Sequence, residues 1–246
     1  MKVICVIPAR YGSSRFPGKP LASETGQPLI RHVYEAAARA RQVDAVVVAT
    51  DDQRIRRAVE AFGGRAVMTL AQHPCGTNRV AEAARALPEA EIVINLQGDE
   101  PDLDASLLDC LVDVMQADGG IEAATVAGPL APDEAIDPNS VKVALAASGD
   151  ALYFSRAPIP WARDGEASRR APMLRHFGIY AYRAAALQAY AAMPQTALEL
   201  TEKLEQLRWL ENGRRMRVMV TDRRPLGVDT PASYAAFVAR WQASRR

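Results

Sequence analysis

The chain has 246 residues, and 30 Lys and Arg against 29 Asp and Glu give it a formal net charge of +1. This length suits one large domain or one domain with a small annex, and the near-neutral charge gives no reason to expect a nucleic-acid or membrane partner. Three widely spaced cysteines without a CxxC pair argue against a disulfide framework or a zinc site. Because no stretch approaches the ~20 apolar residues of a membrane span, and the first apolar run is too short for a signal peptide, we expect a cytoplasmic protein.

The first half of the chain alternates strand and helix signals. Residues 2–9 form an apolar, β-branched run that predicts a strand, and a Gly- and Pro-rich loop then leads to a helix from Pro28. The alternation continues with predicted strands over 44–50, 65–69 and 91–98, and with helices over 52–64 and from about Thr77. Continuous apolar strands separated by helices imply a mainly parallel sheet covered on both faces. We therefore expect an α/β fold with a doubly wound core.

The pattern changes after a predicted helix over 107–116. Short strand candidates separated by turns cover residues 141–145, 151–155 and 177–183. They predict a small antiparallel annex at about 141–195, within a single domain of residues 1–246. The polar stretch 160–173 is either a loop over a site or an ordinary surface excursion. The prediction ends with a helix over 197–213, a strand over 215–221 and a helix from about Pro231.

The first loop, within residues 7–21, concentrates positive charge on a flexible backbone. Arg10, Arg15 and Lys19 lie directly after the first predicted strand, in a loop with two glycines. In open parallel sheets, ligands bind at the carboxyl ends of strands, where backbone amides and cations can hold a phosphate chain. The loop has neither GxGxxG nor GxxxxGK[ST] spacing, which argues against a dinucleotide site or a P-loop. The residues themselves leave two interpretations open, a polyphosphate loop and solvated surface.

Two carboxylates stand at other predicted strand ends. Asp99 follows the strand of INLQGDEP, and Asp229 in GVDTP lies between a strand and a helix. Carboxylates beside bound phosphates suit Mg²⁺, which takes its remaining ligands from phosphate and water. Asp229 has an alternative role as a helix N-cap, so only convergence with Asp99 would make it a metal ligand. With the cationic loop, these residues favour nucleotidyl transfer, in which an acceptor oxygen attacks the α-phosphorus and pyrophosphate leaves.

Seven stretches, in the same order from residue 3 to about residue 234, closely resemble the 3-deoxy-manno-octulosonate (Kdo) cytidylyltransferase family: VIPARYGSSRFPGKPL, VVATDD, VINLQGDEP, ALYFSRAPIPW, RHFGIYAYR, LEQLRWLENG and GVDTP. The resemblance implies a nucleotide-diphospho-sugar transferase fold and the reaction of CTP with Kdo to give CMP-Kdo and pyrophosphate, with Mg²⁺ as cofactor. It further implies a homodimer, for which we expect the annex to supply the contact, and a role in lipopolysaccharide or capsule biosynthesis.

The motif match also implies roles on the nucleotide side. Contacts to the CTP phosphates would come from Arg10, Ser13, Arg15 and Lys19. Asp99 and Asp229 would hold Mg²⁺ and, with Arg10, Arg15 and Lys19, form the catalytic set. The base side of the nucleotide site would be formed by Cys75, Gly76, Thr77, Asn78 and Arg79.

Kdo carries a carboxylate and several hydroxyls, so its pocket needs a cation and hydrogen-bonding groups. The resemblance assigns the sugar side to Gln97, Arg156, Arg163, His176, Tyr180, Glu205 and Gln206. From the residues alone, we would favour sheet packing for Tyr180, a partnered buried imidazole for His176 and a solvated helix face for Glu205. The resemblance reverses that preference for every residue of this set except Arg163.

The segment CGTNR, residues 75–79, departs from the SGTDR or SGTER that is common in the family. Cys75 replaces a strong hydroxyl donor, and Asn78 replaces a carboxylate, which only accepts hydrogen bonds, with an amide that also donates. We expect CTP to remain the preferred nucleotide because backbone groups at Gly76 and Thr77 can still read cytosine.

Other functions remain as alternatives. A cytidylyltransferase for sialic acid or for an amino analogue of Kdo would need a similar site; RFPGKP and LEQLR favour Kdo over sialic acid but leave the amino analogue open. A non-catalytic nucleotide sensor is the alternative from another class of protein. Retention of both aspartates, together with Arg156 and Glu205, argues against a sensor, which has no need of a second-substrate pocket.

Overall fold

The computed structural model describes residues 1–12 and 16–244. In it, the chain folds into two compact units. The first unit comprises Met1–Val112 and Pro225–Arg246, and the second comprises Asp113–Arg224. The predicted annex, residues 141–195, lies inside the second unit, which starts earlier and ends later. Within the described ranges, no helix is both long enough and apolar enough to cross a bilayer.

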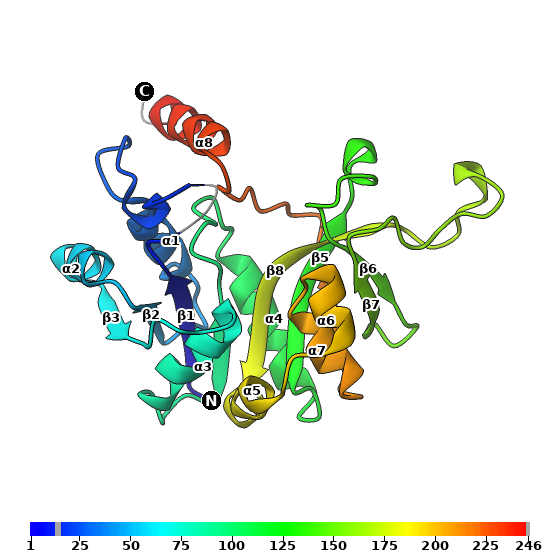
Figure 1. Cartoon of the computed structure of the whole chain (residues 1–246), viewed down its shortest axis with the longest axis horizontal. Helices are drawn as coiled ribbons and strands as arrows, with labels where there is room; N and C mark the ends of the chain where they lie inside the picture. The colour runs from blue at the N-terminus through cyan, green and yellow to red at the C-terminus, as the bar shows by residue number, and fades with distance from the viewer. Residues whose placement is uncertain (13–15, 245–246) are drawn as a thin grey trace. The chain divides into compact units, whose positions relative to one another are not determined.

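The first unit is built on four parallel strands in the order β3-β2-β1-β4. Figure 1 shows β3, β2 and β1 side by side, and the strands span Val3–Ala9 (β1), Ala45–Thr50 (β2), Arg65–Met68 (β3) and Ile92–Asn95 (β4). Ile4 and Val6 pair with Ala45 and Val47, so the two central strands run in register. The strands β1 and β4 are buried along both faces, which explains why their sequences are continuously apolar.

The helices of the first unit are α1 (Leu29–Ala37), α2 (Gln53–Ala61), α3 (Gly76–Arg85), the start of α4 (Ser106–Ala117) and α8 (Pro231–Ala243). Two of these helices, α2 and α8, begin at a side-chain cap. The Asp52 side chain accepts from the Arg54 amide at the start of α2, and Thr230 caps α8 with a reciprocal contact to Ser233. A short 3₁₀ turn, Lys19–Leu21, follows the first loop. These caps fix the starts of α2 and α8.

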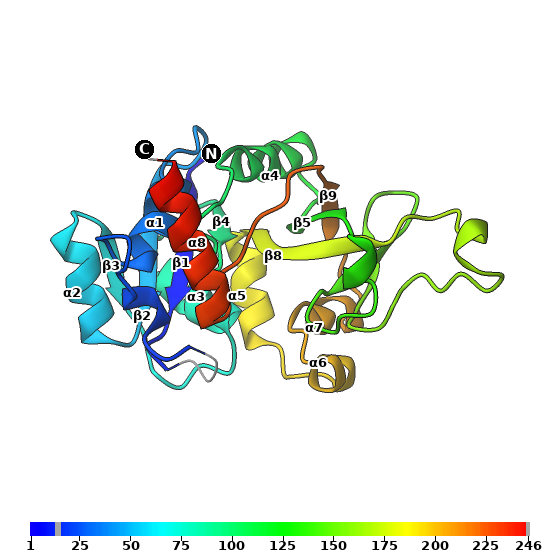
Figure 2. The ribbon, with the colours of Figure 1, turned by 90° about the horizontal axis from the view of Figure 1, so that it is seen from above.

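The second unit contains a mixed sheet. β5 (Ala123–Pro129) lies between β8 (Leu174–Arg183), which is antiparallel to it, and β9 (Arg217–Val220), which is parallel. β6 (Lys142–Leu145) and β7 (Ala151–Ser155) form an antiparallel hairpin, and β6 also pairs with β8. In both views, the segment 156–173 projects away from these strands, with the 3₁₀ turn Glu166–Ser168 at its end (Figures 1 and 2). Another 3₁₀ turn covers Pro132–Glu134.

The α/β class and the mostly parallel, mixed sheet confirm the predicted fold, but two elements of the second unit were not predicted. β5 has the sequence AATVAGP, whose Ala, Gly and Pro have low strand propensity, and its place is fixed by pairing on both sides. Helix α5 (Ala184–Ala192) is alanine-rich and has almost no polar face to mark a helical period.

The prediction of one continuous helix over 197–213 is wrong, because the structure has two helices there, α6 (Ala197–Glu202) and α7 (Gln206–Glu211). Lys203 ends α6 in the left-handed region, with φ 54°. The break brings Glu199 of α6 against Arg208 of α7, and their side chains meet in a buried ion pair of 2.5 Å. Tertiary pairing of these charges therefore replaces the straight helix that the apolar spacing predicts.

Candidate active site

A depression in the first unit begins at the carboxyl end of β1. Two adjoining cavities, each of about 200 Å³, share the same four lining residues, Pro8, Ala9, Arg10 and Gln97. The first cavity is completed by His73, Pro74, Cys75, Gly76 and Arg79. The second is completed by Lys19, Pro20, Gly98, Asp99 and Asp229. Because they share these residues, the two cavities adjoin at the edge where parallel sheets bind ligands, and together they are called the depression below.

The second cavity contains a cation between two carboxylates. The Lys19 ammonium donates to Asp99 Oδ2 at 2.8 Å and to the Val228 carbonyl at 2.9 Å. It also lies 3.7 Å from Asp229 Oδ1. The sequence made a metal role for Asp229 conditional on convergence with Asp99, and the structure brings the two carboxylates to the same ammonium group.

The electrostatics of Asp99 reflect this crowding. Burial raises the pKa of the Asp99 carboxyl above its ordinary value, the Lys19 charge opposes that rise, and the neighbouring Asp229 carboxylate adds to it. The Lys19 cation therefore stabilises the charged form of Asp99. Among the residues that the structure describes, no cluster of three or more His, Cys, Asp or Glu side chains is placed to hold a metal ion. The pair of aspartates fits a hard divalent cation that takes its other ligands from phosphate and water.

Asp229 does not act as the helix cap that its sequence position allows. Thr230 occupies the N-cap position of α8 and accepts from the Ser233 amide. The preceding backbone is held by the Val228 amide, which donates to the Asp99 carbonyl at 2.7 Å. A side chain at Gly227 would approach Glu100 Oε1 at 3.1 Å, so this close passage favours glycine. The GVDT sequence thus brings Asp229 beside Asp99.

The two ends of the first loop meet at its base. Arg10 lines both cavities, and Lys19 lines the second. The Gly18 amide donates to the Tyr11 carbonyl at 3.0 Å, and Gly18 has φ +72°. This glycine therefore turns the chain, and its amide is engaged within the loop. Of the predicted phosphate contacts, Ser13 and Arg15 lie outside the described residues.

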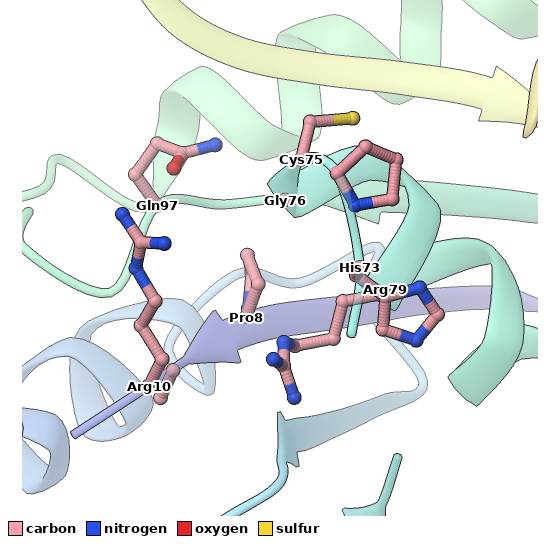
Figure 3. Close-up of a pocket in the computed structure, with 9 residues that line it drawn as sticks. Pro8, Arg10, His73, Cys75, Gly76, Arg79 and Gln97 are labelled. Carbon is pink, nitrogen blue, oxygen red and sulfur yellow. The ribbon is translucent and has the colours of Figure 1, made fainter. Parts of the chain in front are cut away.

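The start of α3 forms one wall of the first cavity. Figure 3 shows Cys75 and Arg79 on one side of that cavity, and Arg10 and Gln97 on the other. The Cys75 thiol donates to Asn78 Oδ1 at 2.8 Å. The two residues that depart from the family sequence therefore contact each other, and the thiol provides the local partner that the Asn78 carbonyl oxygen needs.

Arg79, which lines the first cavity, and Thr77 are both largely buried. The Arg79 guanidinium donates to Thr69 Oγ1 at 2.6 Å and lies 3.1 Å from Asp51 Oδ1. Thr77 Oγ1 accepts from the Asn95 amide at 3.1 Å. These contacts connect the predicted base segment to the ends of β2 and β4, so Asp51 of the VVATDD motif has a supporting role that sequence reasoning did not assign.

Gln97 was predicted to meet the sugar, and it lies in the first unit on the wall common to both cavities. Its amide donates to Asn95 Oδ1 at 3.3 Å. The next residue, Gly98, passes so close to β1 that a side chain would meet the Pro8 carbonyl oxygen at 3.0 Å. Glycine in QGDEP thus permits the strand ends to come together and leaves Gln97 facing the depression.

His73 is a lining residue that sequence reasoning missed. It belongs to the first cavity, and its Nε2 contacts the Glu82 carboxylate of α3. Glu82 also accepts from the Leu70 amide, which holds the segment before α3 in place. The sequence signal was an imidazole two residues before CGTNR, but a single His has no spacing pattern that marks it as a wall of a site.

Arg156 of the second unit is engaged within the fold. Its guanidinium donates to the carbonyls of Glu202 at 2.6 Å, Pro138 at 2.7 Å and Lys203 at 3.3 Å. Its backbone amide donates to Glu202 Oε2 at 2.9 Å. In this arrangement, the arginine joins β7 to the end of α6.

His176 and Tyr180 lie inside the second unit, on β8. Thr125 Oγ1 donates to the Ile179 carbonyl at 2.7 Å, so at 2.9 Å it accepts from His176 Nε2–H. The imidazole packs edge-on against Phe154 and beside Tyr180. Burial lowers the His176 pKa from 6.5 to about 3, so this ring is neutral at physiological pH. The structure gives both residues the packing roles that the residues alone suggested.

The remaining predicted sugar residues are distributed over two segments. Glu205 is half-buried at the start of α7, where its carbonyl accepts from the Tyr190 hydroxyl, and Gln206 is buried beside it. Arg163 is exposed in the projecting segment 156–173. Each predicted sugar residue other than Gln97 thus belongs to the second unit.

Comparison with known proteins gives a consistent result. The model of the cytidylyltransferase family matches residues 4–216. A 3-deoxy-manno-octulosonate cytidylyltransferase of Anaeromyxobacter sp. (strain Fw109-5) is 54% identical over 231 residues, which cover 94% of this chain and 93% of the relative. The enzyme of the same name from Syntrophobacter fumaroxidans is 50% identical over 241 residues, which cover 97% and 96%.

Solved structures are also similar. The structure of CMP:2-keto-3-deoxy-manno-octonic acid synthetase complexed with CTP has a TM-score of 0.93 and 45% sequence identity, and the match covers 99% of this chain and 100% of that one. A cytidylyltransferase of Leptospira borgpetersenii has a TM-score of 0.65 at 18% identity, covering 97% and 86%, which shows a shared fold.

Proposed function

Because the chain belongs to the 3-deoxy-manno-octulosonate cytidylyltransferase family, we propose that it transfers CMP from CTP to the anomeric hydroxyl of Kdo, releasing pyrophosphate. The observation that carries this proposal is the Lys19 ammonium beside Asp99 and Asp229, on the wall of a depression at the end of β1. The chain is thus a nucleotidyltransferase whose substrates are CTP and Kdo.

In the proposed reaction, the Kdo hydroxyl oxygen forms a bond to the α-phosphorus as the bond between that phosphorus and the α,β-bridging oxygen breaks. The electron pair of the broken bond leaves with pyrophosphate, and the hydroxyl proton is released. Arg10 and Lys19 supply positive charge on the cavity walls, which stabilises the charge that grows on the leaving group. Ser13 and Arg15 complete the proposed phosphate set.

We assign Mg²⁺ to Asp99 and Asp229, whose carboxylates converge and offer the hard oxygen ligands that this ion prefers. When bound, the ion would neutralise phosphate charge and favour departure of pyrophosphate. Asp99 is half-buried and supported through Lys19, whereas Asp229 is exposed, so Asp99 supplies the better fixed ligand.

Reading of the base is assigned to the α3 wall. The Cys75 to Asn78 contact holds the Asn78 carbonyl oxygen, and Gly76 lines the cavity without a side chain. Backbone groups at Gly76 and Thr77 therefore become the proposed readers of cytosine, supported by the fixed start of α3.

The sugar side is assigned to Gln97 and to residues of the second unit: Arg156, Arg163, His176, Tyr180, Glu205 and Gln206. What supports this assignment is the motif match. Recognition of the Kdo carboxylate by Arg156 would require exchange of one of its carbonyl contacts for the substrate, whereas Gln97 already faces the depression. We further propose a cytoplasmic homodimer that serves lipopolysaccharide or capsule biosynthesis.

Pyrophosphate release tests the function. Purified protein with Mg²⁺ and Kdo should turn over CTP faster than UTP, ATP or dCTP, and Kdo should be used in preference to its amino analogue and to sialic acid. Equal rates with UTP would contradict the assignment of base reading, and faster turnover of either alternative sugar would contradict the assignment of the acceptor. Binding of CTP without release of pyrophosphate would instead identify a nucleotide sensor.

A further inference from the structure

Three groups are stacked at the base of the first loop. Gly18 packs against the Tyr11 ring so closely that an added side chain would meet ring atoms at 3.2 Å. The Arg54 guanidinium carbon lies over the same ring, 3.4 Å from its centroid. This distance is well inside the ~6 Å range of a cation–π contact. Tyr11 is thus in contact with its own loop and with a cation from helix α2.

The Arg54 guanidinium is itself held in place by the Asp52 carboxylate. Its Nε donates to Asp52 Oδ1 at 3.0 Å, and its Nη2 donates to Asp52 Oδ2 at 2.6 Å. Asp52 also caps α2 by accepting from the Arg54 amide at 2.8 Å. Hydrogen bonding by Arg54 lowers the Asp52 pKa, so the carboxylate is charged at neutral pH. The guanidinium that covers Tyr11 is therefore held by a bidentate contact at a helix terminus.

The stack lies between two residues of the proposed phosphate site. Arg10 precedes Tyr11 and Lys19 follows Gly18, and both of these cations line the second cavity. The hydrogen bond from the Gly18 amide to the Tyr11 carbonyl joins the backbone at the same point. The contact between Tyr11 and Gly18 therefore fixes the distance between Arg10 and Lys19.

We propose that Tyr11 and Arg54 are positioning residues for CTP, which hold Arg10 and Lys19 at the separation that the triphosphate requires. The proposal rests on the assignment of those two cations to the CTP phosphates. A loop whose ends are already fixed loses less conformational freedom when it binds, so its contacts contribute more to affinity. The stack acts on nucleotide binding and touches no reacting atom.

Steady-state kinetics and direct CTP binding test the stack. Arg54→Ala and Tyr11→Leu should each raise KM for CTP, and weaken CTP binding in calorimetry, by roughly threefold to tenfold, with kcat and KM for Kdo nearly unchanged. Tyr11→Phe keeps the ring and should retain wild-type values. The double variant should lose no more than the larger single loss, because the two residues act through one contact. Arg57→Ala, an exposed arginine on the same helix, is the matched control.

Several outcomes would overturn the inference. Unchanged CTP affinity in Arg54→Ala, or a loss in Tyr11→Phe as large as in Tyr11→Leu, would show that the stacked ring does not position the site. Equal rises in KM for CTP and Kdo, with a lower unfolding temperature, would show a purely structural role. Wild-type protein that binds CTP without turnover would contradict the proposed function, and the calorimetric comparison of variants would still decide the role of the stack.

Discussion

The two units use charged side chains differently, and two lysines show how. In the first unit, Lys19 reaches a carboxylate and a backbone carbonyl on the wall of a cavity. In the second, Lys142 is fully buried and donates to the carbonyls of Asp137 and Arg156, and burial lowers its pKa. The first lysine faces space that a ligand can enter, whereas the second stabilises the fold. The contacts around a charged residue in a motif must therefore be known before a chemical role is assigned to it.

The same contrast separates the predicted residues of the two substrates. Of the described nucleotide-side residues, Arg10, Lys19 and Cys75 line the depression of the first unit. In the second unit, His176, Tyr180 and Arg156 are engaged by neighbours. A substitution of Asp99 in the first unit should therefore affect turnover with little change in stability. Substitutions in the second should affect stability first.

The largest expected effect is on turnover in the first unit. Asp99→Asn preserves the shape of the side chain but removes the charge beside Lys19, and we expect pyrophosphate release to fall by about a hundredfold or more. The unfolding transition and CD spectrum should stay close to wild type, because one hydrogen-bond acceptor remains at this position. Activity within a fewfold of wild type would remove Asp99 from the catalytic set and would weaken the contrast between the units.

A large effect on stability is expected in the second unit. Glu199 and Arg208 form a buried pair through two hydrogen bonds of 2.8 and 2.5 Å. Glu199→Ala leaves the guanidinium buried without its carboxylate, and should lower the free energy of unfolding by about 3–5 kcal/mol in urea denaturation. The control is Glu166→Ala, which removes the exposed carboxylate of the pair with Arg169 and should leave the denaturation curve unchanged. Similar curves for the two variants would show that burial does not distinguish these pairs.

The smallest effect is a pH dependence that comes from His176. Its pKa is lowered from 6.5 to about 3 in the folded protein, so below pH 6.5 the unfolded chain takes up the proton first. The contribution of the neutral imidazole is fully present above pH 6.5 and decreases as the pH falls toward 3, by at most ~1.4 kcal/mol per pH unit. His176→Gln should flatten the stability profile relative to wild type between pH 6 and 4, measured by urea denaturation. Parallel wild-type and variant profiles would contradict the buried, neutral state.

The sequence predicted most of the first unit because its strands and helices carry strong local signals. Buried parallel strands are continuously apolar, and GVDTP and QGDEP stand at strand or helix ends, where their carboxylates could be expected to meet. The second unit was harder to predict, because β5 depends on its neighbours and the break at Lys203 depends on the pairing of Glu199 with Arg208. The supporting roles of Asp51 and His73 were also missed, since each acts through a contact that only the folded chain creates.

Lys19 has a consequence for how the chain is held together. Its contact with the Val228 carbonyl joins residues that are 209 positions apart, at opposite ends of the first unit's sequence. One side chain therefore ties the terminal segment before α8 to the amino-terminal loop, in addition to bringing charge to the cavity. A substitution of Lys19 would remove this long-range contact and would also change the charge in the site. The chemical and structural roles of this lysine cannot be separated by substitution. Asp99 is therefore the better position at which to test the chemistry.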